Sequence, residues 1–135
     1  GRTHQLRVHL AAAGAPILGG SCVDGGRVTF GDSGGRVHSL ATDTGKLAWE
    51  KAADVGGPVE ASPILVGSVL YGGTVNRICW GLKASDGSPV WKEAPGDRDN
   101  HGGFTRPPLF VDGKLIFPAE GAPYAYQFTT AAPLR

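Results

Sequence analysis

Two copies of a turn that is followed by a tryptophan, 42 residues apart, constrain the fold of this chain more than any other feature. The first copy ends at Trp49 in the segment TGKLAW, and the second ends at Trp91 in the segment DGSPVW. A glycine, Gly45 or Gly87, stands at the same place in each copy and supplies the positive φ that many tight turns require. We therefore expect one supersecondary unit to be repeated along the chain.

A pair of short runs rich in β-branched and aromatic residues precedes each turn, and a third pair follows the second turn. The runs are 28–30 and 37–40, 69–71 and 78–82, and 115–117 and 124–128. A period in the low forties, built from short strands and glycine turns, is typical of propeller blades with about four strands each. The sequence therefore predicts an all-β fold, a partial β-propeller of two to three four-stranded antiparallel blades. The third copy has Ala131 and Arg135 where the earlier copies have glycine and tryptophan.

Composition agrees with a small β-rich domain. The chain has 135 residues, with 22 glycines, 10 prolines and no methionine, which favours turns and strands. The formal net charge of +1 gives no global field that would recruit nucleic acid. No apolar run approaches the roughly 18 residues of a membrane span. The chain begins at Gly1 and shows no signal peptide, so we expect a fragment or a processed product.

Three groups of segments resemble PQQ-like (BamB-type) β-propeller repeats over about residues 15–135. They are VDGGRVTFG at 23–31 with GRVHSL at 35–40, the connection GPVEASPI at 57–64, and the opening RPPLFVDG at 106–113. The resemblance implies blades at about 21–57, 58–103 and 104–135. It gives Gly45, Trp49, Gly87 and Trp91 a structural role, with each indole buried between neighbouring blades and its N–H bonded. It also implies a non-catalytic scaffold that binds protein partners, in a periplasmic or other extracytoplasmic location.

Residues 1–20 have a different character. Thr3 is a suitable N-cap and Gly14 a suitable stop, so a short N-terminal helix is expected at about 3–13. The segment GRTHQLRVHL, continued by GAPILGG, resembles the late motif of the RluA-type pseudouridine synthases, whose usual pattern is GHPILGD. The alternative hypothesis is thus the C-terminal part of a cytoplasmic, RNA-modifying synthase fused to propeller repeats. RNA contacts would then come from Arg2, His4, Gln5 and Arg7. The His-Arg-Leu-Asp motif that carries the family's nucleophile is missing.

The repeats also resemble those of quinoprotein dehydrogenases, so outer blades of such an enzyme are a further alternative. That family holds PQQ with an adjacent-cysteine disulfide, a stacking tryptophan and a calcium site. Here Cys22 and Cys79 are far apart and lack metal-ligand spacing, and two partly buried thiols are expected. Trp80 lies in a predicted strand, with its facing unknown. PQQ is therefore possible but unsupported, and no cofactor is predicted.

Two further motifs suggest chemistry. Asp97, Asp99, Asn100 and His101 bring oxygen and imidazole ligands into one long loop, a candidate for calcium or a transition metal. A solvated polar loop is the competing interpretation, and no metal site is predicted. The stretch GDSGG around Ser33 matches the nucleophile motif of chymotrypsin-like proteases. It lacks that fold's preceding barrel and falls where a hairpin is expected, which favours a structural turn.

Overall fold

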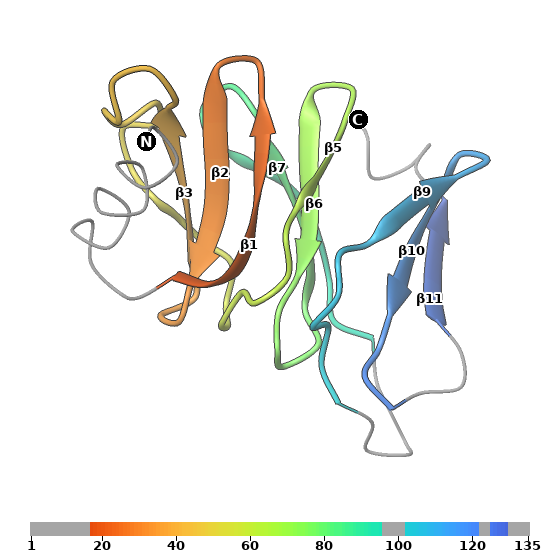
Figure 1. Cartoon of the computed structure of the whole chain (residues 1–135). Coiled ribbons are helices and arrows are strands. Elements are labelled where there is room, and N and C mark those ends of the chain that lie inside the picture. Colours follow the sequence, from red (N-terminus) through yellow and green to blue (C-terminus); the bar gives the residue numbers. More distant parts are fainter. Residues whose placement is uncertain (1–16, 96–101, 122–124, 130–135) are drawn as a thin grey trace.

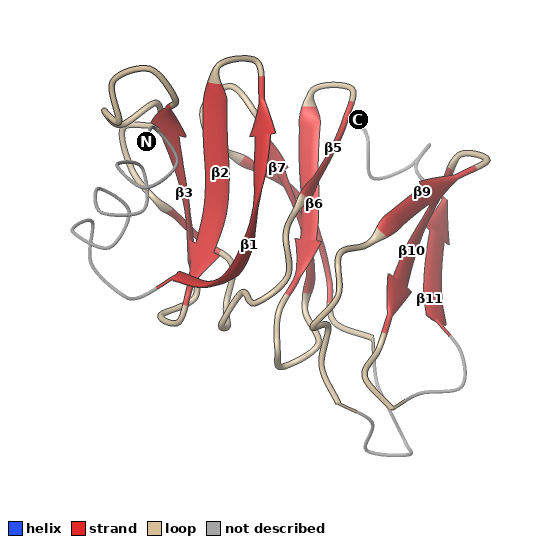
Figure 2. Ribbon diagram, viewed as in Figure 1, coloured by secondary structure: helices blue, strands red, loops and turns tan. Residues whose placement is uncertain are grey.

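The computed structural model describes residues 17–95, 102–121 and 125–129, and every statement below concerns this part of the chain. Eleven β-strands form three antiparallel sheets, and the described residues contain no helix (Figures 1 and 2). The sheets follow one another along the chain and stand side by side in Figure 1. This arrangement confirms the prediction of an all-β, partial β-propeller.

Each sheet is one blade whose strands pair in chain order. Blade one contains β1 (Ile17–Asp24), β2 (Arg27–Asp32), β3 (Arg36–Ala41) and β4 (Ala53–Asp54). Blade two contains β5 (Ile64–Val66), β6 (Val69–Gly73), β7 (Cys79–Lys83) and β8 (Pro89–Glu93). Blade three contains β9 (Leu109–Val111), β10 (Lys114–Pro118) and β11 (Ala125–Thr129).

Alternation along β2 separates the two faces of blade one. Arg27 donates to a carbonyl of blade two, and a Cβ at Gly31 would overlap Val59 in the connection that leads to blade two. Val28 and Phe30, on the opposite face, pack with Leu40 in a cluster of their own. Because side chains alternate with a period of two, both faces of blade one carry buried residues.

The two large apolar cores lie between the blades, not within one of them. The core between blades one and two contains Val37, Trp49, Val55, Val59, Leu70, Trp80 and Leu82. The core between blades two and three contains Val69, Tyr71, Cys79, Phe104, Leu115, Phe117 and Ala119. A sheet that buries its faces against its neighbours gains most of its hydrophobic stabilisation from them.

Several details differ from the sequence-based expectations. Strand β1 begins at Ile17, so residues 17–20, expected in the N-terminal segment, are part of blade one. Blade three has three strands within the described residues, where four were expected. The repeat makes no prediction about which element holds Trp49, and this residue lies outside any strand, between the isolated bridge of Leu47 with Leu40 and strand β4. The expected helix at 3–13 falls outside the described residues.

Candidate functional site at the interfaces between blades

Trp49 connects blade one to blade two. Its side chain is 2% exposed, and its Nε1–H donates to the carbonyl oxygen of Ala84 at 2.9 Å. The indole lies against Gly87, where a Cβ would be 2.7 Å from Cε3 of the ring. The φ of Gly87 is +80°, which L side chains rarely adopt. The turn glycine of one blade thus accommodates the tryptophan of the blade before it.

The turns of blades one and two have the same hydrogen bonds. In blade one, Ala41 N donates to Lys46 O and Gly45 N donates to Ala41 O, both at 2.8 Å. In blade two, Lys83 N donates to Ser88 O and Gly87 N donates to Lys83 O, again at 2.8 Å. The φ of Gly45 is +74°. The repeated Thr-Gly and Asp-Gly pairs are therefore one turn built twice.

Trp91 lies at the second interface, between blades two and three. It pairs with Gly81 in the β7–β8 ladder and is half-buried. Its ring centroid is 5.0 Å from that of Phe128 and 6.0 Å from that of Phe117, both on blade three. The two tryptophans of the repeat thus occupy successive interfaces. Trp91 differs from Trp49 in remaining part of a strand.

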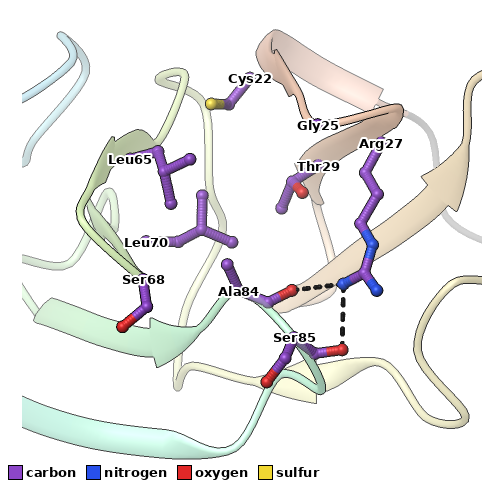
Figure 3. A pocket seen from close by; sticks show the side chains of 9 residues that line it. All are labelled: Cys22, Gly25, Arg27, Thr29, Leu65, Ser68, Leu70, Ala84 and Ser85. Atoms are coloured by element: carbon purple, nitrogen blue, oxygen red, sulfur yellow. Dashed lines mark hydrogen bonds between the residues drawn. The ribbon is translucent and has the colours of Figure 1, made fainter.

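A groove of about 370 Å³ lies between blades one and two. Arg27 spans it, with Nη1 donating to the carbonyl oxygens of Ala84 at 2.6 Å and Ser85 at 3.0 Å (Figure 3). The Ala84 carbonyl oxygen therefore accepts hydrogen bonds from both the guanidinium of Arg27 and the indole N–H of Trp49. The groove is lined by Cys22, Gly25, Arg27, Thr29, Leu65, Ser68, Leu70, Ala84 and Ser85. No motif in the sequence marked this site.

The GDSGG stretch forms the hairpin between β2 and β3, and its aspartate is the organising residue. The carboxylate of Asp32 accepts hydrogen bonds from Gly34 N at 2.8 Å, Arg36 N at 3.0 Å and His38 Nε2 at 2.7 Å. Burial works to raise the pKa of Asp32, but these hydrogen bonds outweigh it and hold that pKa below its usual value. Ser33 is exposed, and within the described structure no hydrogen bond joins it to His38.

Blade two has the same hairpin with different chemistry. Thr74 stands in the place of Asp32, and its Oγ1 accepts a hydrogen bond from Ile78 N at 2.9 Å. Both residues therefore cap the loop that follows their strand, through a bond to the backbone four residues on. This recurrence makes the backbone-capping bond of Asp32 a structural feature of the hairpin, and a serine-nucleophile arrangement is not formed there.

The structure does not describe the candidate RNA-contact and metal-ligand residues. Residues Arg2, His4, Gln5, Arg7, Asp97, Asp99, Asn100 and His101 lie outside the described residues. Within the residues described, no group of three or more His, Cys, Asp or Glu side chains is placed to hold a metal ion.

The described residues also do not fit a PQQ site of the kind that the quinoprotein resemblance implies. Cys22 and Cys79 are on different blades and form no disulfide with each other. Cys79 is fully buried, and burial, with a smaller contribution from the charge of Glu93, raises its thiol pKa well above the usual value. Trp80 is 1% exposed and packs in the core against Gly72, so it has no free face on which a cofactor ring could stack.

Strand β9 carries the largest run of exposed apolar residues that the structure describes. Leu109 is 53% exposed, Phe110 43% and Val111 49%. Among the described strands, β9 lies at an edge and pairs only with β10, in the sheet order β11–β10–β9. Three consecutive exposed apolar residues on an edge strand are uncommon in stable monomers, and such surfaces are often sites of interaction.

Comparison of the fold with solved structures identifies the same architecture in proteins that include alcohol and methanol dehydrogenases and BamB. Quinohemoprotein alcohol dehydrogenase from Comamonas testosteroni matches 79% of this chain with a TM-score of 0.66 and 22% identity, over 18% of its own length. BamB from Moraxella catarrhalis matches 88% of this chain with a TM-score of 0.60 and 15% identity, over 51% of its own length. A europium-containing methanol dehydrogenase matches 76% with a TM-score of 0.62 and 17% identity, over 20% of its length.

These likenesses establish the fold, and the chain spans at most about half the length of these structures. No curated protein sequence matches the chain significantly. A family model described as outer membrane protein assembly factor BamB matches residues 5–128. That match runs through most of the segment that resembles a pseudouridine synthase motif, and the comparisons give the synthase resemblance no support. The chain therefore belongs to the PQQ-like repeat family of the outer membrane protein assembly factor BamB.

Proposed function

We propose that this chain is a non-catalytic propeller scaffold that binds extended protein segments. The family description names an outer membrane protein assembly factor, and an unfolded outer membrane protein is the partner we infer. The observation that carries the proposal is the exposed apolar edge strand β9. The recurring features of the repeat, the turn glycines and the tryptophans, serve the packing between blades.

Strand β9 suits an extended partner because one of its backbone edges is unpaired. It pairs with β10 through Phe110 opposite Leu115 and Leu109 opposite Ile116, and no strand of the described part of the chain lies on its other edge. An added strand would bond to the N–H and C=O groups on this edge of β9. Apolar side chains of the added strand would lie beside the exposed apolar side chains of β9 on both faces of the sheet. Extended segments with consecutive apolar residues, which place apolar side chains on both faces, have the required pattern.

An extracytoplasmic location is part of the same proposal, because outer membrane proteins are assembled outside the cytoplasm. In the described residues, no helix has the length and hydropathy needed to cross a membrane. RNA is not a partner in this proposal, because the resemblance that suggested it receives no support from the comparisons.

Site-specific photocrosslinking tests the proposal. A photoreactive phenylalanine analogue at Phe110 should crosslink to an unfolded outer membrane protein diluted from urea. The matched control places the analogue at Glu93, an exposed polar residue at the end of the edge strand β8. We expect a strong crosslink from position 110 and a weak one from position 93, and Leu109→Ser should reduce the former.

Two outcomes would contradict the proposal. Equal crosslinking from positions 110 and 93 would show that the contact is not specific to β9. Crosslinks from position 110 only to a second copy of this chain would show that the exposed strand serves self-association.

A further inference from the structure

The two interfaces between blades can be compared position by position. In blade one Thr29 pairs with Ser39, and in blade two Tyr71 pairs with Gly81. Each pair stands two residues beyond the start of its strand, β2 or β6, and faces the following blade. The pairs therefore occupy equivalent places in successive interfaces.

A tyrosine fills this place between blades two and three. Tyr71 is fully buried, and its ring lies 5.8 Å from that of Trp91 in an edge-on arrangement. Gly81 leaves the room that the ring needs, since a Cβ there would be 3.0 Å from Cε1 of Tyr71. The hydroxyl of Tyr71 has no hydrogen-bond partner in the described structure. The ring of Tyr71 thus fills this place in the interface.

Between blades one and two, the counterpart of Tyr71 is Thr29, which lines the groove. Thr29 and Ser39 are smaller, and their hydroxyls bond to each other at 3.3 Å. Figure 3 shows Leu65 and Leu70 of blade two on one side of the groove, facing Cys22 and Thr29 of blade one. The space of about 370 Å³ is within the range of small-ligand sites. Packing alone would favour a filled interface like the next one.

We propose that this groove accepts a tyrosine side chain presented by a partner protein. The ring would rest on Leu65 and Leu70, beside Thr29, the counterpart of Tyr71. The phenolic hydroxyl would find donors and acceptors in Thr29, Ser68 and Ser85, which Tyr71 lacks in its own site. This inference rests on the proposed protein-binding function and adds a specific anchor to it, separate from strand β9.

The test uses p-cresol, the side-chain analogue of tyrosine, and isotope-labelled protein observed by NMR. Titration should shift the methyl resonances of Leu65 and Leu70 in a saturable manner, while those of Leu115 in the next interface stay unchanged. Toluene, which lacks the hydroxyl, should bind about tenfold more weakly. A peptide with one central tyrosine should shift the same methyl groups, and its phenylalanine counterpart should bind more weakly.

The double substitution Thr29→Tyr with Ser39→Gly recreates the Tyr71–Gly81 pair and should close the groove. It should weaken p-cresol binding by about tenfold or more and raise the midpoint of thermal unfolding. Ser68→Phe, at an exposed position on the rim, should block the groove from blade two and weaken p-cresol binding in the same way. This variant keeps the test decisive if the double variant misfolds. Ser33→Tyr adds a tyrosine at an exposed hairpin remote from the groove and should leave binding unchanged.

The inference is wrong if p-cresol shifts no methyl resonance at the groove, and this holds for any result of the β9 crosslinking experiment. It is also wrong if toluene binds as tightly as p-cresol, or if a folded groove-closing variant binds p-cresol like the native chain. If p-cresol binds but the tyrosine peptide causes no shift, the proposal that the groove accepts a tyrosine side chain of a partner protein is contradicted. Failure of the β9 crosslink alone would contradict the proposed function and leave the phenol site standing.

Discussion

Substitution of Gly87 by alanine tests whether the tryptophan of blade one and the turn of blade two form one packed unit. The φ of Gly87 is +80°, where an L side chain costs about 1–2 kcal/mol. The new Cβ would also lie 2.7 Å from Cε3 and 2.9 Å from Cδ2 of Trp49. Carbon atoms prefer a separation of about 3.5–4.0 Å, and overpacking of this kind costs about 1–3 kcal/mol. We therefore expect Gly87→Ala to lower the free energy of unfolding by about 2–5 kcal/mol.

A control glycine separates the two contributions. Gly113 has a φ of +75°, and a Cβ added there would meet nothing within 4 Å, so Gly113→Ala should cost only the backbone contribution of about 1–2 kcal/mol. Trp49→Ala supplies the second control, because Gly87→Ala should lose its steric contribution when the ring is absent. Urea unfolding followed by far-UV circular dichroism measures the free energies of these variants and of the double variant. Equal costs for Gly87→Ala and Gly113→Ala, or coupling below about 0.5 kcal/mol in the cycle, would refute the reasoning.

Four further predictions follow from the same packing. Trp49→Ala should cost about 3–5 kcal/mol in urea unfolding, and Trp91→Ala less, because Trp91 is only half-buried. Asp32 has a lowered pKa, so its contribution to stability is complete above its unfolded pKa and is lost as the pH falls through the folded value; Asp32→Asn should flatten the acid limb of a stability–pH curve. Ser33→Ala should change the free energy of unfolding by less than about 0.5 kcal/mol, because the side chain is exposed. Cys79 should react with a thiol reagent only when the protein unfolds, and rapid labelling of the native chain would contradict its burial.

The sequence was sufficient to predict the blades because the repeat is local. Each Thr-Gly or Asp-Gly turn lies within one blade and requires the same backbone shape, so its residues recur with the period of the blades. The strands at 28–30, 37–40 and 69–71 follow from β-propensity next to such turns, and they lie within β2, β3 and β6. Their existence was predicted more accurately than their ends.

Contacts between blades could not be read from the repeat itself. Trp49 packs against Gly87 and donates to Ala84, and nothing in one copy indicates which neighbour the other copy will meet. The bond from Arg27 to Ala84 has the same long-range character. The repeat also does not indicate that its two tryptophans differ in backbone structure. Trp91 lies in strand β8, whereas Trp49 lies outside the strand ladder.

The groove and the Asp32–His38 pair were missed for a different reason. The groove is lined by the small residue Thr29, which becomes informative only when its register equates it with Tyr71. The GDSGG motif drew attention to its serine, whereas the structure uses its aspartate to cap the hairpin. A register prediction for the strand pairs would have drawn attention to Thr29 but not to the bonds of Asp32 within the hairpin.

Hydrogen exchange at the indole N–H of Trp49 tests the central claim, that the blades are stabilised by one another, most directly. This proton is bonded to the Ala84 carbonyl of the next blade, and its ring is 2% exposed. If blades one and two open together, it should exchange at the rate of the slowest backbone amides of β6 and β7. Exchange at the rate of an exposed indole, while those amides remain protected, would show that the blades fold separately and would contradict the account.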